Sequence, residues 1–264
     1  KKLDPGYFNK GTDGYYSMSN TTKEQTNLNV NLNLNKQIND DFEIHGFLRG
    51  EYYNSFGQTM KLETDGGLIV PDKFFIGNSK KPVKYSGNIN GEKTMLSAVG
   101  QIGTSYKDMF FIDVTGRNDW SSSLVYGDGH GTYSYFYPSV SGSWLITNTF
   151  REQLPRWISF AKLRASWAQV GNDTEPYIIN SAYSLISSTV GSDNIFGNVI
   201  GDTKYSADLK PERKNSWEVG IEWRFLDNRI AVDATYYKEN TKDQIMKISV
   251  PYVSGIRYQY VNAG

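Results

Sequence analysis

The chain has 264 residues, in which 28 Lys and Arg balance 28 Asp and Glu, with no Cys and 14% aromatic residues. The neutral balance argues against nucleic acid as a partner, because binding to the phosphate backbone is largely electrostatic. The absence of Cys excludes disulfides and thiolate zinc sites, and two His residues offer little for a metal cluster. A mean hydropathy of −0.53 without a long apolar run excludes a transmembrane helix.

Alternation of apolar and polar residues is the clearest local pattern. Between residues 27 and 35 every apolar residue is followed by Asn, and residues 216–225 alternate apolar with charged or small side chains. A period of two predicts strands with one apolar and one polar face. Weaker alternation predicts six further strands, at residues 42–53, 94–106, 109–118, 136–146, 161–170 and 229–237. Only a short helical turn is expected, within residues 149–157.

The predicted connections alternate in length. Residues 37–41, 107–108 and 226–228 are tight links and residues 147–160 a moderate one, whereas residues 54–92, 119–135 and 172–213 are long. Loops above about 15 residues are uncommon in compact soluble domains. Transmembrane β-barrels combine strands of about 9 to 11 residues with short periplasmic turns and long extracellular loops. We therefore predict an all-β fold, about eight strands of a transmembrane antiparallel β-barrel.

The charges provide a second test of this prediction. An Arg or Lys at mid-bilayer on the lipid face costs roughly 2 to 4 kcal/mol, so a barrel keeps its charges in the lumen. Eleven charged residues fall on the face opposite the apolar set: Glu43, Arg49, Glu51, Asp113, Arg117, Lys162, Arg164, Glu218, Glu222, Arg224 and Asp233. A soluble β-sandwich would show the same alternation, with Val219, Ile221 and Trp223 in its core. The loop asymmetry favours the barrel.

Aromatic residues near the strand ends fit both a barrel and a β-sandwich. In a barrel they form a girdle at the level of the lipid headgroups, and in a sandwich they pack in the core. The residues concerned are Tyr52, Tyr106, Phe136, Trp217, Phe225 and Tyr236. Gly116, Gly142 and Gly220 are expected to allow close approach of neighbouring groups, and Pro138 to occupy an edge-like or bulged position near the rim.

Five strings carry a resemblance to a known family. They are VTGRNDWSSSL (114–124), YFYPSVSGSW (135–144), KLRASWAQVGN (162–172), LKPE (209–212) followed by SWEVG (216–220), and NAG (262–264). In this order they resemble the SusC/RagA family of TonB-dependent outer-membrane transporters of Bacteroidetes. The resemblance covers the chain from about residue 94 to the C-terminus.

The resemblance implies a barrel of 22 strands around a plug domain. Residues 1–264 are then expected to be an internal segment of that barrel, because no plug, N-terminal extension, signal sequence or TonB box is visible. Residues 1–22 and 242–264 should lie on the extracellular side. The resemblance further implies a location in the outer membrane, in contact with its lipid, and no enzymatic activity. It implies import of nutrients, with oligosaccharides favoured over peptides, a SusD-like surface lipoprotein as lid, and TonB acting on the plug.

Candidate substrate contacts lie in the extracellular loops and upper lumen. Aromatic rings with amides and carboxylates suit carbohydrate rings and also peptides. The candidates are Trp120, Tyr126, Tyr133, Tyr135 and Tyr177, with Asn118, Asp119, Asn172 and Asp173 as polar partners. Packing of the loops is the alternative role for each of them. Arg117 and Asp119 are expected either to form a lumenal ion pair or to be solvated separately.

Sequence motifs for catalysis are absent. The chain has no Gly-x-Ser-x-Gly elbow, no paired His ligands and no phosphate-binding loop, so no cofactor is predicted. Asp128 and His130 within residues 127–131 are too few for a metal site, and this segment reads as a loop tip. Two non-enzymatic alternatives to active import remain open, a passive porin without a plug and a surface adhesin with a sandwich fold.

Overall fold

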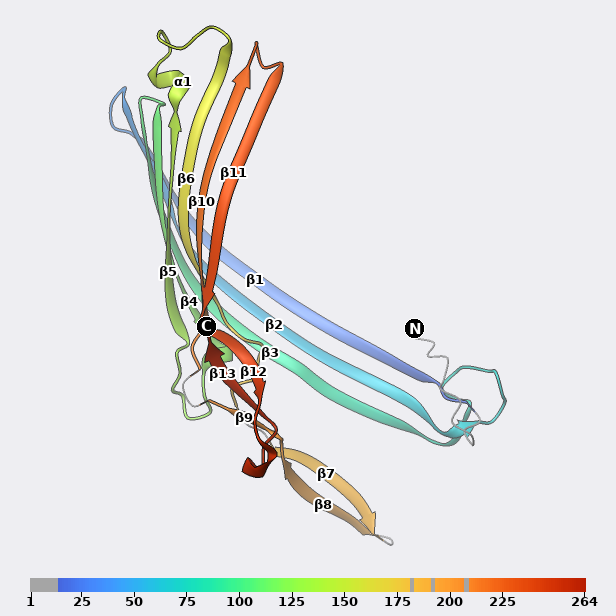
Figure 1. Cartoon of the computed structure of the whole chain (residues 1–264). Coiled ribbons are helices and arrows are strands. Elements are labelled where there is room, and N and C mark those ends of the chain that lie inside the picture. The colour runs from blue at the N-terminus through green and yellow to red at the C-terminus, as the bar shows by residue number, and fades with distance from the viewer. Residues whose placement is uncertain (1–13, 181–182, 191–192, 207–208) are drawn as a thin grey trace. The chain divides into compact units, whose positions relative to one another are not determined.

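A computed structural model describes residues 14–180, 183–190, 193–206 and 209–264 (Figure 1). In this part of the chain the regular structure is β-sheet, apart from one helical turn, α1 (Ile146–Thr149), and two 3-10 turns, η1 (Ser122–Leu124) and η2 (Tyr252–Ser254). None of the helices in these residues has the length and apolar character needed to cross a membrane.

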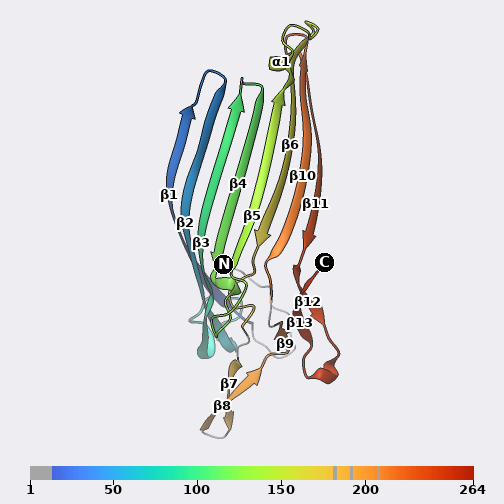
Figure 2. The same cartoon turned by 90° about the vertical axis from the view of Figure 1, so that its left-hand side faces the viewer.

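The main sheet contains eight strands in the order β1-β2-β3-β4-β5-β6-β10-β11 (Figure 2). The pairs from β3 to β11 are antiparallel. The strands are β1 (Ser17–Gln37), β2 (Phe42–Leu68), β3 (Ser79–Tyr106), β4 (Phe110–Ser121), β5 (Ser134–Leu145), β6 (Ile158–Asn172), β10 (Glu212–Phe225) and β11 (Ile230–Lys242). All eight predicted strands are therefore confirmed.

The four short connections lie together at one end of the sheet, uppermost in Figure 2. Two of them are tight hairpin turns with left-handed backbone. Lys107 and Asp108 both have φ of 51°, and Leu226, Asp227 and Asn228 have φ between 53° and 65°. Such turns match the right-handed twist of the flanking strands. The predicted alternation of short and long connections is thus confirmed for this end of the sheet.

Two of the three segments predicted to be long loops contain strands in the structure. Residues 54–92 were expected to be a loop, but β2 runs on to Leu68 and β3 begins at Ser79. Residues 172–213 and 242–264 contain β7 (Tyr183–Val190), β8 (Asp193–Ile200), β9 (Thr203–Tyr205), β12 (Gln244–Ser249) and β13 (Tyr258–Ala263). A search for alternation misses these strands, because their apolar residues do not recur with a clear period of two. The helical turn also lies earlier than the predicted residues 149–157, at α1.

The chain divides into two compact units. Unit 1 comprises residues 1–26 and 53–93, and unit 2 comprises residues 27–52 and 94–264. In the described part of unit 1, Tyr16 and Leu68 are buried, and the buried Asn78 side chain bonds both the N–H and the C=O of Val70 at 2.9 and 2.8 Å. Lys84 Nζ lies 3.0 Å from Asp65 Oδ1, and this hydrogen bond lowers the pKa of Asp65.

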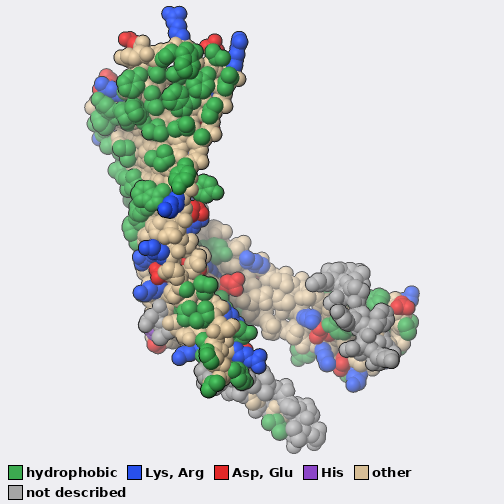
Figure 3. All heavy atoms as spheres, viewed as in Figure 1, with side chains coloured by type: hydrophobic (Ala, Val, Ile, Leu, Met, Phe, Trp, Pro, Cys, Tyr) green, Lys and Arg blue, Asp and Glu red, His purple; other side chains and the backbone are tan. Residues whose placement is uncertain are grey.

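Unit 2 leaves one face of its strands apolar and uncovered. On β4 and its neighbours the cross-strand pairs Ile102–Val114, Val114–Val140 and Val219–Ala165 put apolar residues opposite one another on this outer face. Hydrophobic side chains gather there near the short connections (Figure 3). Val219 and Ile221 are 49% and 39% exposed, which contradicts their place in a sandwich core. The polar face of the same strands carries the charges, as predicted.

The aromatic residues expected at the strand ends lie on the exposed outer face. Phe136, Trp217 and Tyr236 are 61%, 59% and 72% exposed, so their role is not core packing. Near the short connections, Phe110 stacks on Trp144 with ring centroids 5.7 Å apart. This distribution is that of a girdle at an interface between apolar and aqueous surroundings.

Two of the three glycines confirm the predicted close approach. A Cβ on Gly220 would lie 2.5 Å from Arg164 Nε, and one on Gly116 would lie 3.0 Å from the Phe136 ring. Gly142 does not show a close approach, because a Cβ there would meet only Phe111 O at 3.6 Å, an ordinary contact. Pro138 is edge-like as predicted, since β5 pairs with β6 only from Ser139 onward.

Gly46 and Gly50 on β2 provide a matched test of packing between neighbouring strands. A Cβ on Gly46 would lie 2.4 Å from the Gln101 carbonyl oxygen, whereas one on Gly50 meets nothing within 4 Å. We expect Gly46→Ala to lower the free energy of unfolding by about 1 to 3 kcal/mol, because the β3 backbone must shift. Gly50→Ala should leave it nearly unchanged. Equilibrium unfolding of both variants checks this, and equal effects would contradict it.

Candidate functional site

The predicted binding residues gather at the end of the sheet that carries the long connections. Asn118 to Trp120 end β4, Tyr135 begins β5, and Asn172 ends β6. Cross-strand register divides them between two faces. Asp119 pairs with Ser97 and Tyr135 on the inner, polar face, whereas Trp120 pairs with Leu96 on the outer, apolar face.

Arg117 is the centre of the polar contacts on the inner face. Its Nε donates to Asp119 Oδ1 at 2.8 Å, its Nη2 donates to Ser97 Oγ at 2.9 Å, and its Nη1 lies 2.9 Å from Glu51 Oε2. Of the two alternatives for Arg117 and Asp119, the structure has the ion pair. The Asp119 carboxylate is 3% exposed and also accepts a hydrogen bond from the Tyr137 hydroxyl. Hydrogen bonds from the guanidinium and the phenol thus take the place of water around this buried carboxylate.

These contacts continue across five strands. Arg49 Nε donates to Asn31 on β1, and Arg49 Nη1 lies 3.4 Å from Glu51 Oε1, the same carboxylate that Arg117 binds. We call this chain the inner polar belt: Asn31, Arg49, Glu51, Ser97, Arg117, Asp119 and Tyr137. These bonds join β1 to β2, β2 to β4 across β3, β3 to β4, and β4 to β5. The belt therefore fixes strand register on the polar face.

A second ion-pair cluster lies on the inner face of β6, β10 and β11. Arg164 Nη2 lies 2.8 Å from Asp233 Oδ1 and 2.6 Å from Thr235 Oγ1, and Arg164 Nε lies 3.8 Å from Glu218 Oε1. The side chain of Arg164 passes over Gly220, which explains the close approach there. Paired opposite charges of this kind make the inner face polar.

Side-chain hydrogen bonds fix the long connections where they join the strands. The Ser121 hydroxyl donates to Asp173 Oδ2, which ties η1 to the end of β6. The Tyr126 hydroxyl donates to the Ser206 carbonyl at 2.8 Å and accepts from the Leu209 N–H at 2.9 Å. Tyr126 is therefore a loop-fixing residue in this structure.

The LKPE and NAG strings, 50 residues apart, meet in space. Asn262 Oδ1 accepts from the Lys210 N–H and Asn262 Nδ2 donates to the Lys210 carbonyl, both at 2.9 Å. The Glu212 carboxylate accepts from the Ile245 N–H at 2.9 Å and from Asn172 Nδ2 at 3.1 Å. We call these contacts, with those of Ser121 and Tyr126, the loop anchors. They explain in physical terms why these short strings occur together.

The predicted contact residues differ in their access to solvent. Tyr135 is 7% exposed and stacks on Tyr137 with centroids 5.9 Å apart, while Gly171 leaves room beside its ring. Tyr133 and Tyr177 are 40% and 57% exposed, and Asn172 is exposed at the end of β6. Trp120 and Asn118 lie on the outer face, a placement that favours contact with lipid headgroups over contact with a solute.

The glycine-rich segment at residues 127–131 forms a turn closed by its own side chains. Asp128 Oδ1 accepts from the His130 N–H and from its ring, and the His130 ring stacks on Tyr126 with centroids 4.3 Å apart. The backbone hydrogen bond from His130 lowers the pKa of Asp128. Within the described residues, no group of three or more His, Cys, Asp or Glu is arranged to hold a metal ion.

Sequence reasoning missed a cluster of tyrosines on the small sheet β12-β13-β9. Tyr205 and Tyr260 stack in parallel with centroids 5.5 Å apart, and Lys247 Nζ lies 4.3 Å from the Tyr258 ring centroid. The alternation Tyr258-Gln259-Tyr260 was the available signal, but three residues are too few to identify a strand. The sequence places Glu51 among the inner-face charges, but nothing in it indicates that Glu51 and Ser97 contact Arg117.

Comparison with known proteins places this two-faced sheet in a family. The sequence profile described as "TonB dependent receptor-like, beta-barrel" matches residues 3–264. The chain belongs to this family. The family's members are outer-membrane proteins of Gram-negative bacteria, so the apolar outer face contacts lipid and the inner polar belt lines the lumen.

Two curated proteins are similar in sequence to this chain. The chain is 28% identical over 234 residues to TonB-dependent receptor P26 of Formosa agariphila, covering 81% of this chain and 23% of the relative. It is 25% identical over 166 residues to TonB-dependent receptor SusC of Bacteroides thetaiotaomicron, covering 60% of this chain and 16% of SusC. The chain thus spans less than a quarter of the length of either relative. The resemblance to the SusC/RagA family drawn from the sequence is confirmed.

A solved structure shares the fold. The RagAB peptide transporter matches 94% of this chain and 27% of its own, with a TM-score of 0.79 at 20% identity. At this identity the match establishes the TonB-dependent receptor β-barrel fold.

Asp119 offers a test of the inner polar belt. We expect Asp119→Ala to lower the free energy of unfolding by about 1 to 3 kcal/mol, because Arg117 and Tyr137 lose a buried acceptor. Asp128→Ala, which removes an exposed carboxylate from the loop turn, should have little effect. Equilibrium unfolding in phospholipid vesicles provides the measurement, and a similar loss in both variants would disprove the structural role of the belt.

Ile221 tests the assignment of the outer face to lipid. Ile221→Arg should destabilise the folded barrel by about 2 to 4 kcal/mol, because the guanidinium must enter hydrocarbon. Ser216→Arg, on the inner face of the same strand, should cost much less. The comparison is made by the folded fraction in vesicles at graded urea concentrations. An equal cost on both faces would show that the outer face does not contact lipid.

Proposed function

We propose that this chain is part of an energy-coupled importer that takes oligosaccharides across the outer membrane. One observation carries the proposal: a TonB-dependent receptor sheet with an apolar lipid face and a polar inner face that carries paired charges. A passage lined by paired charges and amides is compatible with neutral, polar solutes such as sugars. The likeness to SusC supports the same class of transporter.

In this proposal, residues 1–264 form only part of the importer. We assign residues 1–264 to the barrel domain, with the plug and TonB box elsewhere in the protein. TonB then acts on the plug to admit solute, and a SusD-like surface lipoprotein covers the loop end as a lid. A passive porin would need neither, so dependence on cellular energy separates the two.

Solute contact is assigned to accessible residues at the loop end. Tyr133 and Tyr177 offer accessible rings, and the exposed Asn172 and the half-buried Asp173 offer polar groups near Tyr177 in the chain. Aromatic rings with a few polar groups are typical of sites that orient a ligand. Asp119, Tyr126 and Tyr135 support the site from below through the contacts described above.

Peptide import is the second candidate. It is favoured by the fold shared with RagAB, which is named a peptide transporter. The two candidates are separated by uptake assays with the full-length protein in whole cells, using matched panels of labelled oligosaccharides and peptides. Uptake of the oligosaccharides that ceases when TonB is deleted supports the proposal. Uptake of peptides alone would replace the substrate class, and uptake that persists without TonB would indicate a porin.

The exposed tyrosines give a residue-level prediction. Loss of one stacking ring weakens binding by roughly 1 kcal/mol, or about fivefold. We therefore expect Tyr177→Ala or Tyr133→Ala to raise the Kd for the transported solute about fivefold. Trp120→Ala, which removes a ring from the outer face, should leave it unchanged. Isothermal titration calorimetry with purified full-length protein gives the values, and the reverse pattern would move the contact site to the outer face.

A further inference from the structure

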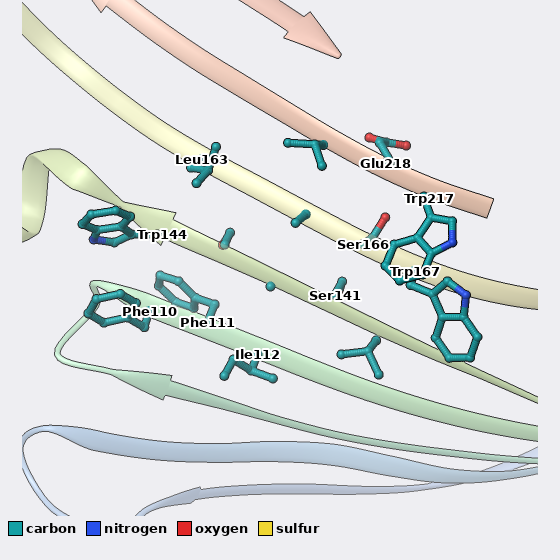
Figure 4. Close-up of a pocket in the computed structure, with 15 residues that line it drawn as sticks. Phe110, Phe111, Ile112, Ser141, Trp144, Leu163, Ser166, Trp167, Trp217 and Glu218 are labelled. Carbon is teal, nitrogen blue, oxygen red and sulfur yellow. The ribbon is translucent and has the colours of Figure 1, made fainter. Parts of the chain in front are cut away.

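The outer face of β4, β5, β6 and β10 contains an apolar groove (Figure 4). Its volume is about 680 Å³. The floor is formed by the paired residues Gly142 and Ala165, and bulky side chains rise on both sides of this floor. The residues used below are Phe110, Val140, Trp144, Leu163, Trp167 and Trp217, and we call this feature the outer groove.

Aromatic pairs bound the outer groove at both ends. Phe110 and Trp144 stack at the end next to the short connections, and Trp167 and Trp217 meet at the other end with centroids 6.1 Å apart. Trp144 is held in place, because its Nε1 donates to Thr149 Oγ1 at 2.7 Å and its ring packs on Phe150. Leu163 and Trp167 are four residues apart on β6, so the groove extends for about 13 Å along the strand.

The recess is a consequence of side-chain choice, because the backbone does not require it. A Cβ on Gly142 would make only an ordinary contact, with Phe111 O at 3.6 Å. A larger residue therefore fits at this position without strain. The described chain has no side chain that fills the groove, although every neighbouring outward position on β5 carries a bulkier residue, Val140 and Trp144.

We propose that the outer groove binds one acyl chain of a phospholipid in the leaflet next to the short connections. The groove is continuous with the apolar face that the family places in the bilayer, and its length and lining suit an extended hydrocarbon chain. Arg151 follows Phe150 in the connection at this end and is exposed, so a cation is available for the phosphate group. The inference goes beyond solute import and does not depend on it.

Packing supplies the physical reason for retention. Lipid tails are as apolar as the side chains, so transfer from bulk lipid brings no hydrophobic gain. An unfilled recess, however, forfeits dispersion contacts with the atoms that line it. A chain lodged between the two fixed aromatic pairs regains these contacts. A lipid in the outer groove therefore exchanges more slowly than the lipids around the rest of the barrel.

Filling the groove tests the proposal. The full-length protein is extracted from vesicles of palmitoyl-oleoyl phosphatidylethanolamine, and native mass spectrometry counts the phospholipid retained as detergent rises. Wild-type protein should retain one phospholipid that Gly142→Leu loses. Gly50→Leu is the matched control, because it adds the same side chain to an open site that shares the outward register of Leu48. Ala165→Leu fills the same floor from β6 and gives a second variant.

Each outcome decides the question. Heat-modifiable migration first shows that the variants are folded. Loss of the retained phospholipid in Gly142→Leu or Ala165→Leu, with retention in Gly50→Leu, supports the site. Retention in both groove variants, or no retained phospholipid in wild type, overturns it.

A photo-crosslinking residue at Val140 gives a readout that needs no groove-filling variant. An adduct of phospholipid mass confirms the occupant. An adduct with a second copy of the chain would instead make the groove a contact between copies and overturn the proposal. Neither result changes with solute uptake, so failure of this inference is distinguishable from failure of the proposed function.

Discussion

Hydrocarbon cannot accept or donate hydrogen bonds, and the rest of this structure depends on that constraint. Every backbone N–H and C=O that enters the bilayer must find its partner within the protein, which only a helix or a closed sheet achieves. Here the partners are neighbouring strands, so side chains project alternately into lipid and lumen. The apolar outer face and the charged inner face are two results of the same pairing pattern.

Polar contacts on the inner face then assume the role that a hydrophobic core has in a soluble protein. Among the described residues few hydrophobic side chains are buried. The inner polar belt and the Arg164 cluster instead join strands that lie two apart in the sheet, Arg117 with Glu51 across β3 and Arg164 with Asp233 across β10. A slip of one residue in any of these strands would carry its charged side chain to the opposite face and break the pair.

The sequence predicts the membrane-spanning strands well because lipid and water impose opposite demands on successive residues. The alternation at residues 27–35 and 216–225 is enough to place β1 and β10 in the sheet. The same reasoning fails for residues 54–68 of β2 and 79–93 of β3, where apolar residues are too sparse to give a clear period of two. It also fails for Glu51 and Ser97, because their partner Arg117 lies on another strand and register is not readable from one segment.

The loop anchors have a consequence for how such a protein can change. Tyr126, Asn262 and Glu212 bind main-chain N–H or C=O groups of the opposite segment. Any residue except proline offers the same backbone groups. Substitutions in the anchored segments therefore leave these hydrogen bonds in place. The tips can therefore acquire new contact residues while the wall beneath them stays the same.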